Sequence, residues 1–204
     1  RGDRQILEDE DGRTQYRGPL VVHTSRLSAS ASEILAGAIQ DYGRGVVVGD
    51  DQTFGKGSVQ QVMDVAPGKG ALKVTTSLFF RPGGASTQGS GVKADIIVPS
   101  IFGDESYGES QQKFALSEAK TKPFPGEQVN GTSANDRWKP VSGATIARLR
   151  ARSKTRVAAN AEFAKVKKSL EKAKRSADFI KVSDILDDED NKSEEERDAE
   201  RKAK

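Results

Sequence analysis

The sequence predicts an α/β core followed by a helical extension. Three features of the first 50 residues carry this prediction: a short apolar run after Pro19, apolar residues at helical spacing over residues 28–42, and a second run of β-branched residues over residues 45–49. Strand, helix and strand within about 30 residues form a βαβ unit. Its two strands pair in parallel through a right-handed crossover.

The predicted core covers residues 19–103. Gly43 follows the helix and ends it, as glycine commonly does. Two later strands flank a glycine-rich turn and therefore form a hairpin, and one more apolar segment follows them. The expected strands are 19–24, 45–49, 59–65, 71–80 and 96–98, and the polar loop is 50–57.

Polar segments flank the core on both sides. Residues 1–18 are mostly charged or turn-forming and are expected to be a surface connection. Residues 104–204 begin as a proline-containing linker. Within them, residues 148–175 hold eleven Lys and Arg against two Glu and predict one amphipathic basic helix. Residues 183–204 hold ten acidic and five basic residues and predict a disordered tail or a solvated helix.

The composition excludes several classes of protein and site. Cysteine is absent, so disulfides and thiolate metal sites are excluded, and a single histidine, His23, argues against a histidine metal site. No apolar run reaches the roughly 18 residues of a membrane span. Residues 148–175 contain one aromatic residue, Phe163, so a solvated helical face is favoured over nucleic-acid binding.

The stretch Ser28–Ile34, SASASEI, carries the most chemical information. Ser30 and Glu33 fit a capping box, in which the serine caps the helix, and from these residues alone capping is the simpler explanation. The alternative is a nucleophile. A hydroxyl at a helix N-terminus has free amides beside it, and the amide of Ala31 would then stabilise an oxyanion.

A nucleophilic serine needs a base, and Lys56 is the candidate. It lies between two glycines that permit close approach, and Phe54 offers an apolar wall. A lysine base must be neutral, so it must be desolvated. Gln60 could orient its amine, but in a straight strand the two residues stand about 13 Å apart, so this link requires a bend at the glycines. For an isolated G-K-G sequence, a surface turn is the simpler interpretation.

Two rival motifs fail. The sequence around Lys56 lacks the first glycine and the final Ser or Thr of a phosphate-binding loop, because Asp50 and Gly57 stand at those positions. Ser117 and Lys120 form an S-x-x-K pair, but the accompanying S-D-N and K-T-G elements are missing.

In their order and spacing, these segments resemble the carboxyl-terminal processing (tail-specific) serine proteases of peptidase family S41. The resemblance rests on SASASEI, QDYGR, VVG and TFGKGSVQ, and it continues through KVTTSLFFRPGGASTQGSGVKADIIVP. It implies a crotonase- and ClpP-like protease core, represented by its C-terminal half, and the helical region of the long bacterial form. One departure is the loop at Asp50-Asp51-Gln52, which is one residue longer than is common in the family.

The resemblance also implies roles for individual residues. Ser30 would be the nucleophile, Lys56 the general base and Gln60 the residue that positions the lysine. The amide of Ala31 would donate to the oxyanion. Asp41 would support an ordered site, although locally it is also a polar residue at a helix end.

The function implied is endopeptidase cleavage near protein C-termini through an acyl-enzyme, without metal or organic cofactor. The partners would be proteins with accessible C-termini and an adaptor protein, and the compartment would be the periplasm, with inner-membrane association left open. The family's PDZ domain and second oxyanion donor would lie upstream of this chain, so the chain alone is expected to be poorly active. The contrasting hypothesis is a non-catalytic binding or scaffold module, or an inactive fragment, in which Ser30 only caps its helix.

Overall fold

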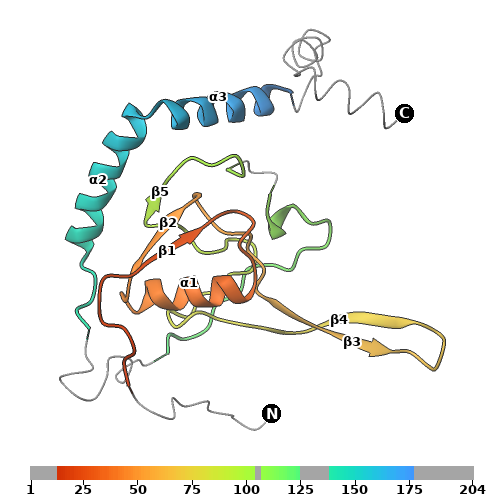
Figure 1. The fold of residues 1–204 in the computed structure, drawn as a ribbon. Helices are drawn as coiled ribbons and strands as arrows, with labels where there is room; N and C mark the ends of the chain where they lie inside the picture. Colours follow the sequence, from red (N-terminus) through yellow and green to blue (C-terminus); the bar gives the residue numbers. More distant parts are fainter. Residues whose placement is uncertain (1–12, 104–106, 125–137, 177–204) are drawn as a thin grey trace.

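The computed structural model describes residues 13–103, 107–124 and 138–176 (Figure 1). The first twelve residues of the predicted surface connection, most of the predicted linker and the acidic tail lie outside the described residues.

The predicted βαβ unit is confirmed. Strand β1 (Val21–Thr24) leads through a turn into helix α1 (Ala31–Asp41), and strand β2 (Val46–Gly49) returns parallel to β1. A short strand β5 (Ile96–Ile97) pairs in parallel with the other edge of β2, so the sheet order is β1-β2-β5. The carboxyl ends of all three strands therefore lie at one edge of the sheet.

The core between α1 and the sheet is small. Ala36 of α1, Val47 of β2 and Val92 are fully buried together. Val22 and Ala94 pack against this cluster and are partly buried. Glycine at position 45 is needed here, because a Cβ would lie 2.7 Å from the backbone oxygen of Leu20.

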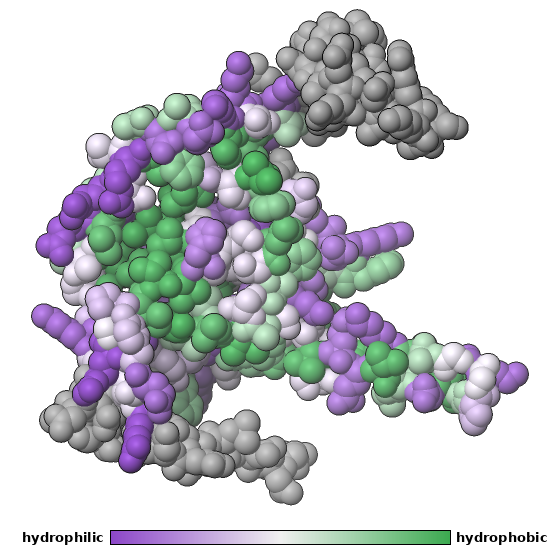
Figure 2. All heavy atoms as spheres, viewed as in Figure 1, coloured by the Kyte–Doolittle hydropathy of each residue, from purple (hydrophilic) through white to green (hydrophobic). Residues whose placement is uncertain are grey.

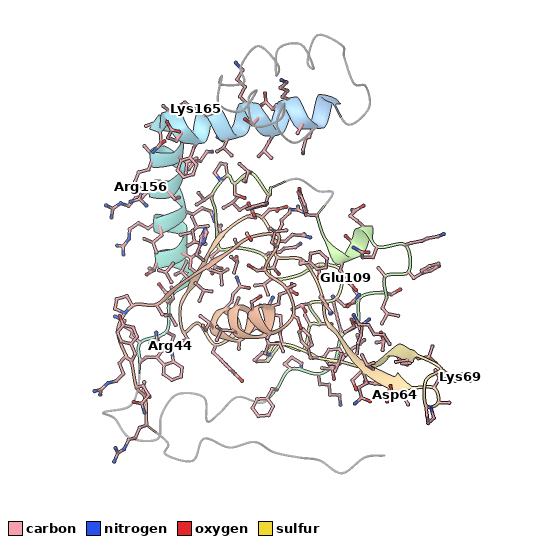
Figure 3. The ribbon with its side chains drawn as sticks, turned by 45° about the vertical axis from the view of Figure 1, so that its right-hand side comes forward. Arg44, Asp64, Lys69, Glu109, Arg156 and Lys165 are labelled. Atoms are coloured by element: carbon pink, nitrogen blue, oxygen red, sulfur yellow. The ribbon has the colours of Figure 1, made fainter. Side chains whose placement is uncertain are left out.

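The predicted hairpin is also confirmed. Strands β3 (Ser58–Asp64) and β4 (Ala71–Leu78) pair antiparallel, with an irregularity between Val59 and Gln60. The hairpin projects away from the rest of the molecule (Figure 1), and Lys69 lies at its tip (Figure 3). Nearly all of its side chains are exposed, including the apolar ones.

The C-terminal region was predicted as one basic helix over residues 148–175, and this prediction is wrong in one respect. The structure has two helices, α2 (Gly143–Ala159) and α3 (Ala161–Ser176), after a short 3₁₀ turn η1 (Glu109–Gln111). Asn160 separates them, because its side-chain Oδ1 accepts hydrogen bonds from the amides of Glu162 and Phe163. Asparagine is a favoured N-cap residue, so it begins a new helix at this point.

Helices α2 and α3 run around the outside of the molecule (Figure 1), and hydrophilic residues follow their outer side (Figure 2). Helix α2 packs against β5, and Nε of Arg150 donates to the carbonyl oxygen of Asp95 at 2.9 Å. The amide of Val141 donates to the carbonyl oxygen of Gly43 at 2.8 Å. In the described residues, no helix has the length and apolar character needed to cross a bilayer.

Candidate active site

Ser30 lies at the turn between β1 and α1. Its backbone has φ +58° and ψ −115°, and among the described residues it is the one non-glycine residue with a positive φ. Such a conformation costs roughly 1–3 kcal/mol and persists where the surroundings hold it. Hydrolases often place a nucleophilic serine on a strained turn that opens a helix, because the turn exposes the hydroxyl.

The capping box predicted from Ser30 and Glu33 is present, but its two halves differ. The amide of Ser30 donates to Oε2 of Glu33 at 2.8 Å. The amide of Glu33 is bonded to the carbonyl oxygen of Ser30 at 2.9 Å, so its approach to the Ser30 side chain is not a directed hydrogen bond. The glutamate therefore holds the turn, while the serine hydroxyl is left available.

The amide of Ala31 lies at the first position of α1, where a helix offers no backbone acceptor. Ala31 is exposed. A free amide directly after Ser30, supported by the helix dipole, can stabilise negative charge that develops beside the hydroxyl.

Glu33 connects the Ser30 turn to the loop that carries Lys56. Its side chain is fully buried, and each carboxylate oxygen accepts two hydrogen bonds. Oε2 accepts from the amides of Ser30 and Lys56, both at 2.8 Å. Oε1 accepts from the amide of Gly55 at 2.7 Å and from the hydroxyl of Thr53. The predicted nucleophile and the predicted base are thus anchored through their backbones to one oxygen atom.

Burial raises the pKa of Glu33, and the hydrogen bonds from Thr53, Gly55, Ser30 and Lys56 only partly offset this effect. The neutral acid can keep all four neighbours. Its hydroxyl would donate to the oxygen of Thr53 and accept from Gly55, while its carbonyl oxygen keeps the other two amides.

The loop before β3 is buried, so the interpretation of G-K-G as a surface turn is wrong. Gly55 has φ +95°, and a Cβ there would lie 2.9 Å from the carbonyl oxygen of Gly89. A Cβ at Gly57 would lie 2.6 Å from the amide nitrogen of Gln88, whose own Oε1 accepts from the Gly57 amide at 3.0 Å. The glycines therefore bring the loop close to residues 86–92, and Lys56 between them is half-buried.

The side chains of the predicted catalytic residues are not joined by hydrogen bonds within the described part of the chain. Gln60 is exposed on β3, beyond the irregularity that follows Val59. The structure thus brings together the backbones of Ser30 and Lys56 and leaves Gln60 on the hairpin. The roles of these three side chains stay predictions.

Asp41, the predicted supporting residue, ties the end of α1 to the segment after β4. Its carboxylate forms an ion pair with Arg81 and accepts the amide of Gly83 at 2.8 Å. Arg81 also donates to the side chain of Gln40 at 2.8 Å. This position is about three helical turns from Ser30, so Asp41 orders the scaffold without touching the predicted catalytic residues.

The loop at Asp50 and Asp51 is held by hydrogen bonds from Arg26. Buried Arg26 donates from Nε and Nη2 to the two carboxylate oxygens of Asp51, at 2.9 and 2.6 Å. The amide of Arg26 donates to Oδ2 of Asp50 at 2.9 Å, and its Nη1 donates to the carbonyl oxygen of Tyr107 at 3.1 Å. These hydrogen bonds fasten the loop at Asp50 and Asp51 to the turn that precedes Ser30.

Sequence reasoning missed part of this arrangement. It gave Glu33 a capping role alone, although Glu33, Ala36 and Gly37 share the buried face of α1 at helical spacing. That spacing was a usable signal, since it places a carboxylate on the inward face. For Arg26 and Gln88 no local signal existed, because their partners lie more than 20 residues away.

The described fold thus combines a parallel βαβ unit with a helix that opens at a strained serine, and the loop that carries a glycine-flanked lysine is fastened to the same turn. The family model "Peptidase family S41" matches residues 1–98 of this chain.

Two curated relatives bear names that describe C-terminal processing. The chain is 46% identical over 121 residues to the tail-specific protease of Haemophilus influenzae, covering 55% of this chain and 17% of the relative. It is 49% identical over 80 residues to the carboxy-terminal-processing protease of Bartonella bacilliformis, covering 39% of this chain and 18% of the relative. The chain thus spans less than a fifth of the length of either relative.

Among solved structures, the photosystem II D1 C-terminal processing protease matches with 35% sequence identity and a TM-score of 0.35. The match covers 44% of this chain and 26% of that chain.

Proposed function

We propose that this chain carries the nucleophile and the general base of a serine endopeptidase that cleaves near protein C-termini. The observation that carries the proposal is the shared carboxylate of Glu33, which accepts the backbone amides of Ser30 and Lys56 on the same oxygen. The match of residues 1–98 to the model of peptidase family S41 and the names of the relatives support the same reaction.

The mechanism begins with an uncharged Lys56. Its amine accepts the proton of the Ser30 hydroxyl while the serine oxygen attacks the carbonyl carbon of the scissile peptide. The amide of Ala31 donates to the oxyanion that forms. The leaving amine takes the proton back, and a water molecule then hydrolyses the acyl-enzyme by the same proton transfers. Gln60 orients the lysine amine without restoring its charge, which requires the base of the hairpin to bend toward Lys56.

The substrates we infer are proteins with accessible C-termini, delivered with or without an adaptor protein, in the periplasm. The printed names of the relatives support the substrate class. Cell fractionation with an antibody against this chain tests the compartment, and recovery in the cytoplasmic fraction would contradict it.

Labelling with a fluorophosphonate tests the chemistry in the full-length protein. We expect Ser30→Ala and Lys56→Ala each to abolish labelling. Two matched controls lie in the same chain: Ser32→Ala removes the neighbouring exposed hydroxyl, and Lys69→Ala removes another lysine between two glycines, at the hairpin tip. Both controls should label normally, and labelling that survives Ser30→Ala or Lys56→Ala would refute the assignment.

One observation favours a second candidate, a non-catalytic binding module. The capping box is formed, and the side chains of Ser30 and Lys56 make no hydrogen bond to each other in the described structure. In that case the unsubstituted full-length protein would not label with the fluorophosphonate.

A further inference from the structure

A cavity, here called the sheet-end cavity, lies beyond the carboxyl ends of β1, β2 and β5. It has a volume of about 450 Å³ and is lined by the ends of these strands, the segment 98–102 and Phe163 of α3. Ligands of open α/β sheets bind at this edge. Its lining includes neither Ser30 nor Lys56, so it is distinct from the proposed catalytic site.

Two buried polar atoms at this cavity have no hydrogen-bond partner in the described structure. They are Oδ1 of Asp50 and Oγ1 of Thr24, in residues that are 2% and 4% exposed. The second carboxylate oxygen of Asp50 is satisfied, since it accepts the amide of Arg26 at 2.9 Å. A buried carboxylate oxygen without a donor is costly, and such an atom in a native protein calls for a partner.

The remaining polar groups around the cavity favour a cationic donor as that partner. The hydroxyl oxygens of Ser25, Ser28 and Ser100 already accept backbone amides. Among the described residues no lysine or arginine lines the cavity, and Asp50 is the one carboxylate in its described lining. An anionic ligand would therefore meet a carboxylate, whereas an ammonium group would gain a charge-assisted hydrogen bond.

The apolar residues on the other side of the cavity determine which non-polar part of a ligand would fit. Ile101, Phe102 and Phe163 present apolar side chains to the cavity. Such a wall binds an aliphatic or aromatic stem, and an aromatic face also attracts a nearby cation. A Cβ at Gly103 would lie 3.5 Å from Oδ1 of Asp50, so the turn at residues 100–103 covers this oxygen, and a ligand would reach the oxygen only if this turn moved outward.

We propose that the sheet-end cavity binds a primary ammonium group on a short apolar stem. The ammonium would donate to Oδ1 of Asp50 and Oγ1 of Thr24, and the stem would pack against Phe102 and Phe163. A free alkylamine and the lysine side chain of a polypeptide share this chemistry. The proposal goes beyond the peptidase function and does not depend on it.

Titration of the full chain with n-hexylammonium, followed by calorimetry and by amide NMR spectra, tests the proposal. We expect saturable binding with shifts at Thr24, Asp50 and Phe163, and at least about tenfold weaker binding of 1-hexanol, which lacks the charge. Equal binding of the alcohol, or shifts confined to other parts of the chain, would overturn the proposal.

Two variants test whether n-hexylammonium binds in the sheet-end cavity. Asp50→Asn preserves an acceptor for the Arg26 amide and should weaken n-hexylammonium binding at least about tenfold. If Asp50→Asn fails to fold, Phe163→Ala can be used instead. This substitution removes only an apolar side chain from the lining of the cavity and should also weaken binding. Unchanged affinity in Phe163→Ala, or in a folded Asp50→Asn, would refute the site. Nα-acetyl-lysine methylamide in place of the alkylamine distinguishes the sources, since tighter binding of the peptide form points to a polypeptide lysine and tighter binding of the alkylamine to a free amine.

Discussion

Replacing Glu33 with glutamine tests the central claim about the site, that one buried carboxylate holds the Ser30 turn and the Lys56 loop together. The carboxylate accepts four hydrogen bonds, two on each oxygen. A glutamine amide nitrogen has no lone pair to accept with. If this nitrogen pointed toward Ser30 and Lys56, its N–H groups would face two other N–H donors. We therefore expect it to point toward Thr53, whose hydroxyl oxygen can accept a hydrogen bond.

In that orientation two buried donors lose their acceptor: the amide of Gly55 and the hydroxyl proton of Thr53, whose oxygen also accepts the amide of Val92. One unsatisfied buried donor costs about 1–3 kcal/mol, and we expect Glu33→Gln to lower the free energy of unfolding by at least that amount. Urea denaturation followed by circular dichroism measures it.

Glu162→Gln is the matched control, because it makes the same chemical change at a side chain that is 76% exposed and pairs with Lys165 across one helical turn. Exposed pairs of this kind contribute about 0–1 kcal/mol. If Glu33→Gln costs no more than Glu162→Gln, the carboxylate does not hold the two segments together.

Three further predictions follow from the same geometry. Burial raises the pKa of Glu33 above 4.5, so protonation of Glu33 stabilises the folded state fully below that pH, and this stabilisation is lost as pH rises through the folded-state pKa. The difference in unfolding free energy between wild type and Glu33→Gln, measured by urea denaturation at several pH values, should therefore narrow with rising pH, and a constant difference would contradict this. Arg26→Lys loses the paired hydrogen bonds to half-exposed Asp51 and should cost about 1–2 kcal/mol in the same assay, so no measurable loss would show that the pairing is irrelevant. Gly55→Ala should lower the melting temperature more than Gly68→Ala, since both have positive φ but a Cβ at Gly68 meets nothing within 4 Å; equal losses would mean that close packing of the loop adds nothing to the backbone strain.

The sequence predicted the elements that short-range patterns encode. Alternating and helical spacings located β1, α1 and β2, and the glycine-rich turn located the hairpin. Asn160 carried a local signal that was overlooked, and the single helix expected around it is two helices. Such features depend on neighbours within one or two turns, so they can be read from the order of residues alone.

The tertiary structure decided which polar groups meet. Glu33 could be recognised as a helix cap, but its bonds to Thr53, Gly55 and Lys56 join residues about 20 positions apart. The unpaired oxygen of Asp50 likewise results from packing of separate segments around a strand end. A hydrogen bond requires two atoms within about 3 Å, and only the folded chain determines which distant residues come that close.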